Sequence, residues 1–473
     1  MGLVLLLRPA AAFADTTVIE FGTSTTAVSA SWPTTSTDTL SLRQIVEETI
    51  AHNLKIKIDE ARVLEARALY SKATAAAYPV SRFQAVVGGP VPEAKTTRIN
   101  DPSSVTRASV SGDFNFGELG VTFRTAGEAI QPLYTFGKID AAKKAARHLI
   151  SAAKSRTRIT RADVVFDVYR AYWAYQLTHS FSQSLRDGAQ ILEKVLVTVE
   201  DLLENDSPQV TENDRLRLIH ALATVRVRLN ETDNGTLLAH RALALLMGRE
   251  QSNLPRVSVR HIDEIGERPP RVETFLQAAL EYRPELEALR ELVAAQRSWA
   301  NFRRAQLWPD LFLGAFIQSA LTTNATNQTN PFINDNFNFF DFGLGIGIRF
   351  ELDVWNKLAE IERAEAELKT RLAQSAAAGQ AIKVEIRSLH DRQISRYERV
   401  ALLRRAHRAA RGWLNASILS YDIGTGDAGE LIDAFLARAT AEGELTKTYF
   451  DIHVAHAGLS RASGELVSVS TSQ

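Results

Sequence analysis

Apolar residues along the chain are first spaced as in a helix and then alternate as in strands. A stripe at helical spacing predicts a helix of about forty residues that ends at Tyr78, before a proline. A period of two then predicts two strands within residues 80–134, joined by a polar loop. Helical spacing returns over residues 137–205 without a proline, and a return helix is expected over residues 211–247.

The same order of patterns occurs a second time. A helix ending at Trp308, with a break near Pro284, precedes two expected strands within residues 310–354. A long helix over residues 356–420 and a return helix over residues 429–463 complete this copy.

Two short sequences mark equivalent places in the two copies. Tyr78 and Trp308 each precede a proline, and the strand-to-helix sequence LYTFGK is echoed by LDVWNK. The chain is therefore interpreted as a duplication, with repeat 1 over residues 39–250, a linker over residues 251–270 and repeat 2 over residues 271–466.

The clearest alternation lies in the last predicted strand. Glycines and an arginine occupy one face, and the other is apolar. Alternation of this kind is typical of strands that face lipid on one side and a polar interior on the other. The predicted bilayer-facing residues are Phe342, Leu344, Ile346, Ile348 and Phe350.

Length and strand count constrain the architecture. Each long helix has about 65 residues, roughly 100 Å at 1.5 Å per residue, which an ordinary globule does not contain. Apolar positions in the second long helix recur on average every 3.5 residues, as in a coiled coil. Four strands cannot close a membrane barrel, which needs about eight. If the strands enter a bilayer, the chain must therefore oligomerise.

Composition excludes several classes of protein. Lys and Arg number 55 and Asp and Glu number 55, so no basic excess points to nucleic acid. The absence of cysteine excludes disulfides and thiolate metal sites. His453 and His456 have no third candidate ligand, so no metal or cofactor is predicted, and no motif suggests an enzyme.

The chain ends carry weaker signals. A short apolar run within residues 1–14 is interpreted as a secretory signal that lacks the usual basic start. Residues 15–38 are expected to be an extended, Thr- and Ser-rich segment, and residues 467–473 a tail.

Taken together, the duplication, the LYTFGK and LDVWNK junctions and the sequence YDIGTGDAGELIDAFL resemble the TolC-type outer-membrane efflux protein family. The resemblance implies an α+β membrane protein. Its homotrimer would form a twelve-stranded β-barrel, four strands per chain, continued by a long α-helical barrel across the periplasm. It also implies a passive exit duct in the bacterial outer membrane, working with a periplasmic adaptor and an inner-membrane transporter in efflux or type I secretion.

The same resemblance assigns roles to residues near the helix ends. Tyr421 and Asp214 correspond to a hydrogen-bonded gate pair, and Glu430 and Asp433 to acidic rings around the pore. Gly426 stands where a gate arginine is usual, so a salt bridge is lost there. The alternative that remains open is a coiled-coil scaffold outside any membrane, whose strands cap a helical bundle.

Overall fold

The computed structural model describes residues 39–96, 112–205, 210–260, 262, 268–325, 327, 335–423, 425–426 and 428–466. The chain divides into two compact units, Met1–Thr39 and Leu40–Gln473, and the fold below is that of the second. The expected signal peptide, N-terminal segment and C-terminal tail lie outside the described residues. No helix among the described residues combines the length and the apolarity needed to cross a bilayer.

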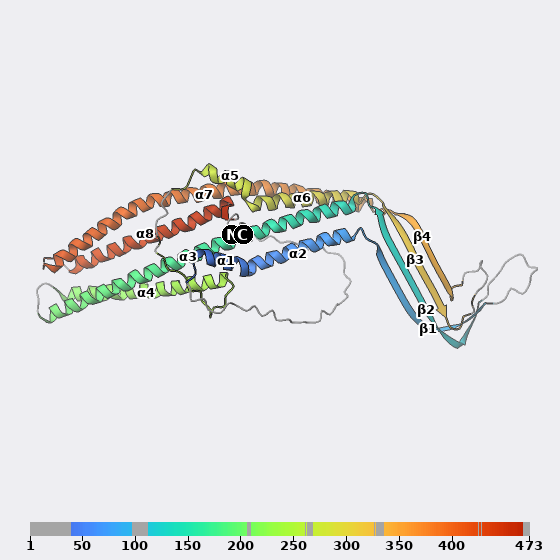
Figure 1. The fold of residues 1–473 in the computed structure, drawn as a ribbon, viewed down its shortest axis with the longest axis horizontal. Helices are drawn as coiled ribbons and strands as arrows, with labels where there is room; N and C mark the ends of the chain where they lie inside the picture. Colours follow the sequence, from blue (N-terminus) through green and yellow to red (C-terminus); the bar gives the residue numbers. More distant parts are fainter. Residues whose placement is uncertain are drawn as a thin grey trace, which may run out of the picture. The chain divides into compact units, whose positions relative to one another are not determined.

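The same order of elements occurs twice (Figure 1). The first set is α1 (Leu42–His52), α2 (Leu54–Ala75), β1 (Val80–Thr96), β2 (Gly112–Tyr134), α3 (Lys138–Glu204) and α4 (Glu212–Leu246). The second set is α5 (Val272–Tyr282), α6 (Pro284–Ala305), β3 (Asp310–Thr322), β4 (Phe339–Arg349), α7 (Val354–Asp422) and α8 (Ala428–Ser463).

The single helix expected at the start of repeat 1 is two helices, so that expectation is corrected. Asn53 leaves helical geometry with ψ 126°, and its side chain accepts a hydrogen bond from the Lys55 amide at 2.9 Å, which caps α2. In repeat 2, Arg283 is extended because Pro284 follows it. The proline predicts the second break, whereas the apolar pattern gives no sign of the first.

The four strands form one antiparallel sheet in the order β1-β2-β3-β4. Paired residues share a face, so Phe83, Gly127, Ile317 and Phe342 lie in one row on the apolar side. On the polar side, Arg82 pairs with Glu128 at 2.9 Å. β1 and β4 are the two edges of the sheet.

Two of the β4 glycines, Gly343 and Gly347, lie on the polar side beneath aromatic rings from β3. A Cβ on Gly343 would lie 2.3 Å from the Phe316 ring, and one on Gly347 would lie 2.7 Å from the Phe312 ring. Phenylalanine rings over strand glycines restore the packing that a missing side chain removes.

Helix α3 is the central packing partner, because it contacts α2, α4, α6 and α8. Where α3 meets α4, Leu218 and Val199 are fully buried, and Ile432 of α8 joins the same cluster. Helix α7 packs against α6 and α8 but makes no comparable contact with α3 or α4 among the described residues. One side of α7 is therefore uncovered.

Residues 257–260 of the linker between the repeats dock onto α3. Leu40 and Val257 make an isolated parallel bridge. The buried amide of Gln176 donates to the Ser258 carbonyl at 2.8 Å and accepts from the Arg260 amide at 2.9 Å. Gln176 therefore satisfies the linker backbone as a neighbouring strand would.

Candidate functional site

The apolar side of the sheet is exposed to an unusual degree. Phe342, Leu344, Ile346 and Ile348 are between 70 and 76% exposed. Large apolar patches of this kind mark a surface that contacts another protein or lipid. β4 ends at Arg349, so Phe350, predicted as part of the bilayer-facing strand, lies just beyond it and is 48% exposed.

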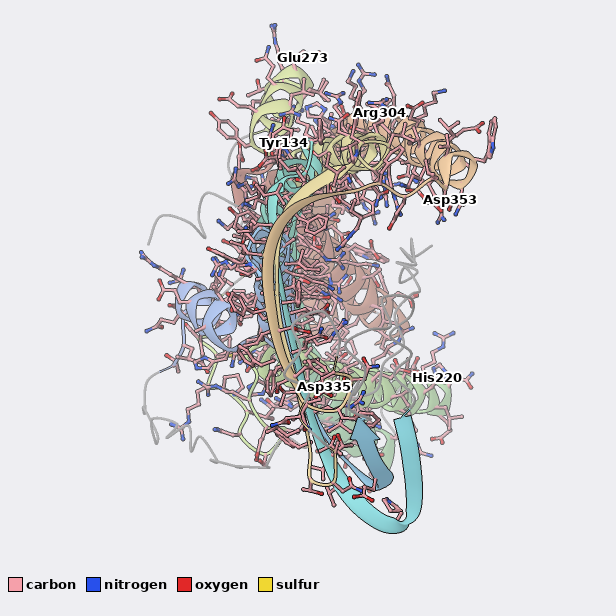
Figure 2. All side chains as sticks on the ribbon, turned by 90° about the vertical axis from the view of Figure 1, so that its right-hand side faces the viewer. Tyr134, His220, Glu273, Arg304, Asp335 and Asp353 are labelled. Carbon is pink, nitrogen blue, oxygen red and sulfur yellow. The ribbon has the colours of Figure 1, made fainter. Side chains whose placement is uncertain are left out.

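The sheet extends from the helices in one direction. In Figure 2, Tyr134 and Asp353 lie near the helical end of the strands, and Asp335 lies near the other end. The strands begin and end beside the termini of α2, α3, α6 and α7, so all four helix-to-strand junctions lie together (Figure 1).

At the far end of the helices, α7 turns into α8. The amides of Thr425 and Gly426 donate to the Ser420 carbonyl at 2.9 and 2.8 Å. A Cβ on Gly426 would lie 2.6 Å from the Tyr421 backbone nitrogen. The tight turn therefore requires glycine, which explains physically why no arginine occupies this position.

The acidic residue of the corresponding turn in repeat 1 caps a helix. The Asp214 carboxylate accepts hydrogen bonds from the Thr211 amide at 2.9 Å and the Thr211 hydroxyl at 2.6 Å, which forms a capping box at the start of α4. Asp214 is buried, and within the described residues of one chain its carboxylate bonds to Thr211 alone. The predicted pairing of Asp214 with Tyr421 stays a prediction.

Glu430 and Asp433 lie in the first turns of α8, and both are exposed. The Trp413 indole of α7 donates to Glu430 at 3.3 Å across the hairpin. This contact fixes one carboxylate toward a defined flank of the α7–α8 pair. Trp413 was not singled out from the sequence, because only the hairpin brings it beside Glu430.

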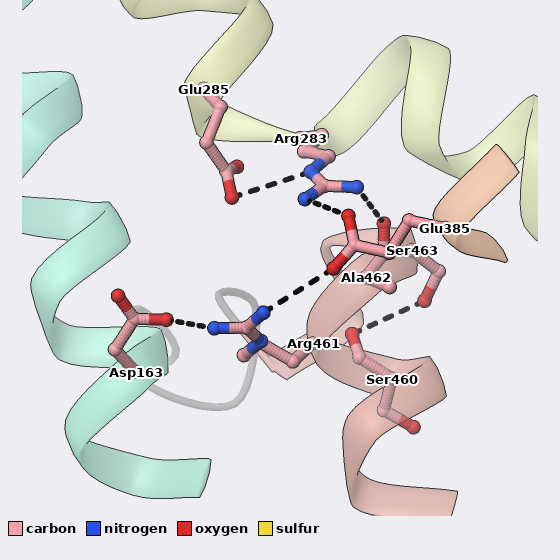
Figure 3. A network of polar contacts seen from close by, with 8 residues as sticks. All are labelled: Asp163, Arg283, Glu285, Glu385, Ser460, Arg461, Ala462 and Ser463. Atoms are coloured by element: carbon pink, nitrogen blue, oxygen red, sulfur yellow. Dashed lines mark hydrogen bonds and ion pairs between the residues drawn. The ribbon is translucent and has the colours of Figure 1, made fainter. Parts of the chain in front are cut away.

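A cluster of charges joins four helices near the bend between α5 and α6 (Figure 3). Buried Arg283 pairs with Glu385 of α7 at 2.7 Å and with Glu285 at 3.3 Å. Arg461 of α8 pairs with Asp163 of α3 and, at 3.4 Å, with Glu385. The sequence gives no periodic signal for this network, because its members come from distant parts of the chain.

Comparison with known protein families finds one that this chain resembles. Residues 275–465 match the family model described as outer membrane efflux protein. These residues, less than half of the chain, are similar to that family. The resemblance inferred from the turn and junction sequences is thereby confirmed, and the matched residues include most of repeat 2. No curated protein sequence matches the chain.

Solved structures extend the likeness to both repeats. The outer-membrane channel OprN has a TM-score of 0.73 at 19% identity, with 89% of each chain covered. VceC from Vibrio cholerae has a TM-score of 0.70 at 18% identity, covering 89% of this chain and 96% of VceC. The open state of MtrE from Neisseria gonorrhoeae has a TM-score of 0.68 at 16% identity. At these identities the likeness establishes the fold.

Proposed function

We propose that the chain is a passive outer-membrane exit duct that works as a homotrimer. The observation that carries the proposal is the open four-stranded sheet, with two unpaired edges and one exposed apolar side. From Leu311 to Leu321 that side runs about 34 Å along β3 at ~3.4 Å per residue. A strand tilt of about 40° reduces this to a height of ~26 Å, close to the ~25 Å apolar band of outer-membrane barrels.

The edges of the sheet favour closure by further copies. Unpaired edge strands leave backbone donors and acceptors that a bilayer cannot satisfy. Joining β4 of one copy to β1 of the next removes both edges. Three copies place twelve strands in the barrel, as in the family that the chain resembles.

The contact between α8 and α3 within one chain serves as the template for a contact between α4 of one copy and α7 of the next. Aligning the glycines that end α4 and α8, Gly248 and Gly464, gives a shift of 216 positions. Leu216 and Ile219 of α4 then correspond to Ile432 and Phe435 of α8. Ile432 and Phe435 belong to the cluster around α3, whereas Leu216 and Ile219 are 52% and 40% exposed.

The matching surface lies on the uncovered side of α7. Aligning the residues that end α3 and α7, Asn205 and Ile423, gives a shift of 218 positions, so Ala406 corresponds to Gly188. A Cβ on Gly188 would lie 3.0 Å from the Phe435 ring, which places Gly188 directly beneath Phe435. Ile219 of one copy would therefore pack over Ala406 of the next copy.

The duct is passive in this proposal, and its gate lies at the far end of the helices. An energised inner-membrane transporter and a periplasmic adaptor supply the energy and the substrate, because the described residues contain no candidate catalytic site. Tyr421 and Asp214 hold the closed tip, and threefold symmetry turns exposed Glu430 and Asp433 into acidic rings that attract cations. The scaffold alternative gives no reason for the exposed apolar side of the sheet.

Planar-bilayer recording with purified protein tests the function. We expect single channels with uniform conductance, together with co-fractionation with the outer membrane. Phe342→Asp with Ile346→Asp places two charges on the apolar side and should abolish insertion, whereas Gln84→Asp with Gln318→Asp on the polar side should not. Equal insertion of both double variants, or absence of channels from the parent protein, would contradict the proposal.

A further inference from the structure

The two long helices differ sharply in charge at equivalent positions. Residues 392–411 of α7 contain seven arginines and one glutamate, a formal charge of +6. The matching residues 174–193 of α3 contain one arginine and two carboxylates. Charge balance over the whole chain therefore conceals a strongly basic stretch on one helix.

Only some of these arginines contact other side chains of the same chain. Arg399 pairs with Glu444 of α8, and Arg404 donates to the Tyr449 hydroxyl at 3.0 Å. Arg405, Arg408 and Arg411 are exposed and form no ion pair or hydrogen bond with any other described residue. Unpaired charges of one sign repel each other, so a surface that retains them gains from an anionic partner.

Three of the arginines form a stripe along one flank of α7. Arg404, Arg408 and Arg411 are spaced four and three residues apart, which places them on one helix face. At about 100° per residue, the three lie between roughly 140° and 200° around the axis from Trp413. Trp413 contacts Glu430, so the arginine stripe and Glu430 lie on opposite flanks of the hairpin.

We propose that the arginine stripe Arg404–Arg408–Arg411, flanked by Arg405, docks an acidic helix of a periplasmic partner protein on the outside of the duct. The outward direction rests on the proposed function, which directs Glu430 into the pore. The spacing of the stripe matches carboxylates four and three residues apart on a partner helix lying along α7.

A neighbouring copy of the chain is a poorer occupant. The α4 helix of a neighbouring copy would pack over Ala406, which lies roughly 140–160° around α7 from Arg404, Arg408 and Arg411, so that contact leaves the stripe uncovered. A partner with carboxylates on one helix face satisfies Arg405, Arg408 and Arg411.

The test uses the purified oligomer and two labelled helical peptides of identical composition. One peptide carries glutamates at positions i, i+4 and i+7, and the other carries them scrambled. Fluorescence anisotropy should show at least tenfold tighter binding of the patterned peptide. Arg408→Glu with Arg411→Glu should remove that binding, and Lys369→Glu with Arg387→Glu, an equal charge change elsewhere on α7, should preserve it.

Two outcomes overturn the proposal. Equal binding of both peptides would mean non-specific charge attraction, and tighter binding of isolated peptidoglycan would assign the stripe to the cell wall. Reversal potentials test the direction separately: Arg408→Glu with Arg411→Glu should leave ion selectivity unchanged, and a shift would place the stripe in the pore. Channel formation by the parent protein is recorded in the same experiment, so a failure of the proposed function is recognised independently.

Discussion

The two repeats hold the same bend with different chemistry. In repeat 1 the Asn53 amide donates to the Leu246 carbonyl at the end of α4, at 2.8 Å. In repeat 2 the Arg283 guanidinium donates to the Ala462 carbonyl at the end of α8, at 3.3 Å, and also pairs with Glu385. One backbone arrangement is thus held by a neutral amide or by an ion network, and the two should respond differently to mutation.

Arg283→Ala should have the largest effect on stability. It removes the buried partner of Glu385, which keeps only the longer contact to Arg461 (Figure 3), and costs about 3 kcal/mol of unfolding free energy. Asn53→Ala should cost about 1 kcal/mol, because it removes a cap and one hydrogen bond. Thermal unfolding of the purified protein measures both, and a larger loss for Asn53→Ala would contradict the comparison. Arg283→Met with Glu385→Leu should recover much of the loss.

Substitution of the glycines that end the return helices should have the next largest effect on the free energy of unfolding. Gly248 and Gly464 have φ of +71° and +87°, so alanine at either position costs about 1–2 kcal/mol. Gly464→Ala should cost more, since its Cβ would lie 2.8 Å from the Tyr282 carbonyl carbon, against 3.1 Å from the His52 oxygen at Gly248. Gly443→Ala, in open space within α8, is the control and should stabilise slightly. Equal losses at Gly248 and Gly464 would show that the closer contact has no effect.

Substitution of equivalent carboxylates at the two tips should change stability at one tip and conduction at the other. Asp214 and Glu430 correspond under the shift of 216 positions, but one is buried in a capping box and the other is exposed. Asp214→Ala should lower the free energy of unfolding by about 1 kcal/mol. Glu430→Ala with Asp433→Ala should leave stability nearly unchanged but weaken the block of single-channel current by multivalent cations. Unchanged block would remove both residues from the pore.

The smallest expected difference is in response to acid. The Ser182 hydroxyl lowers the pKa of Asp233, burial opposes it, and Arg186 at 2.9 Å lowers it further. A carboxyl whose pKa is lower in the folded than in the unfolded state stabilises the fold at pH values above its unfolded pKa of about 4. That stabilisation is lost as the pH falls through the folded pKa. The corresponding contact in repeat 2, from Arg404 to Tyr449, has no carboxylate.

Spin labels on paired cysteines can compare the two hairpins directly. Distances across α3–α4 should broaden below about pH 4, and those across α7–α8 should broaden less. Asp233→Asn should remove the difference in pH response. Identical broadening in both hairpins would show that the Asp233 contact does not set the acid response of repeat 1.

Periodic features of this fold could be predicted from the sequence, and non-periodic ones could not. The alternation through Phe342 and Ile348 predicts both the strand and its apolar side, because each residue contributes to one pattern. The bend at Asn53 depends on a contact with Leu246, 193 residues away, which leaves no local trace. Trp413 beside Glu430 and the network around Arg283 arise in the same way, from helices that meet only after folding.

The central claim, that copies close a ring by repeating the internal α3–α8 contact, is tested most directly by cysteine cross-linking. The chain has no cysteine, so Ile219→Cys with Ala406→Cys introduces the only two thiols. Oxidation should convert the purified protein into a covalent trimer on a denaturing gel, and either single variant should give no trimer. A double variant that stays monomeric, or that forms covalent assemblies other than trimers, would contradict the account.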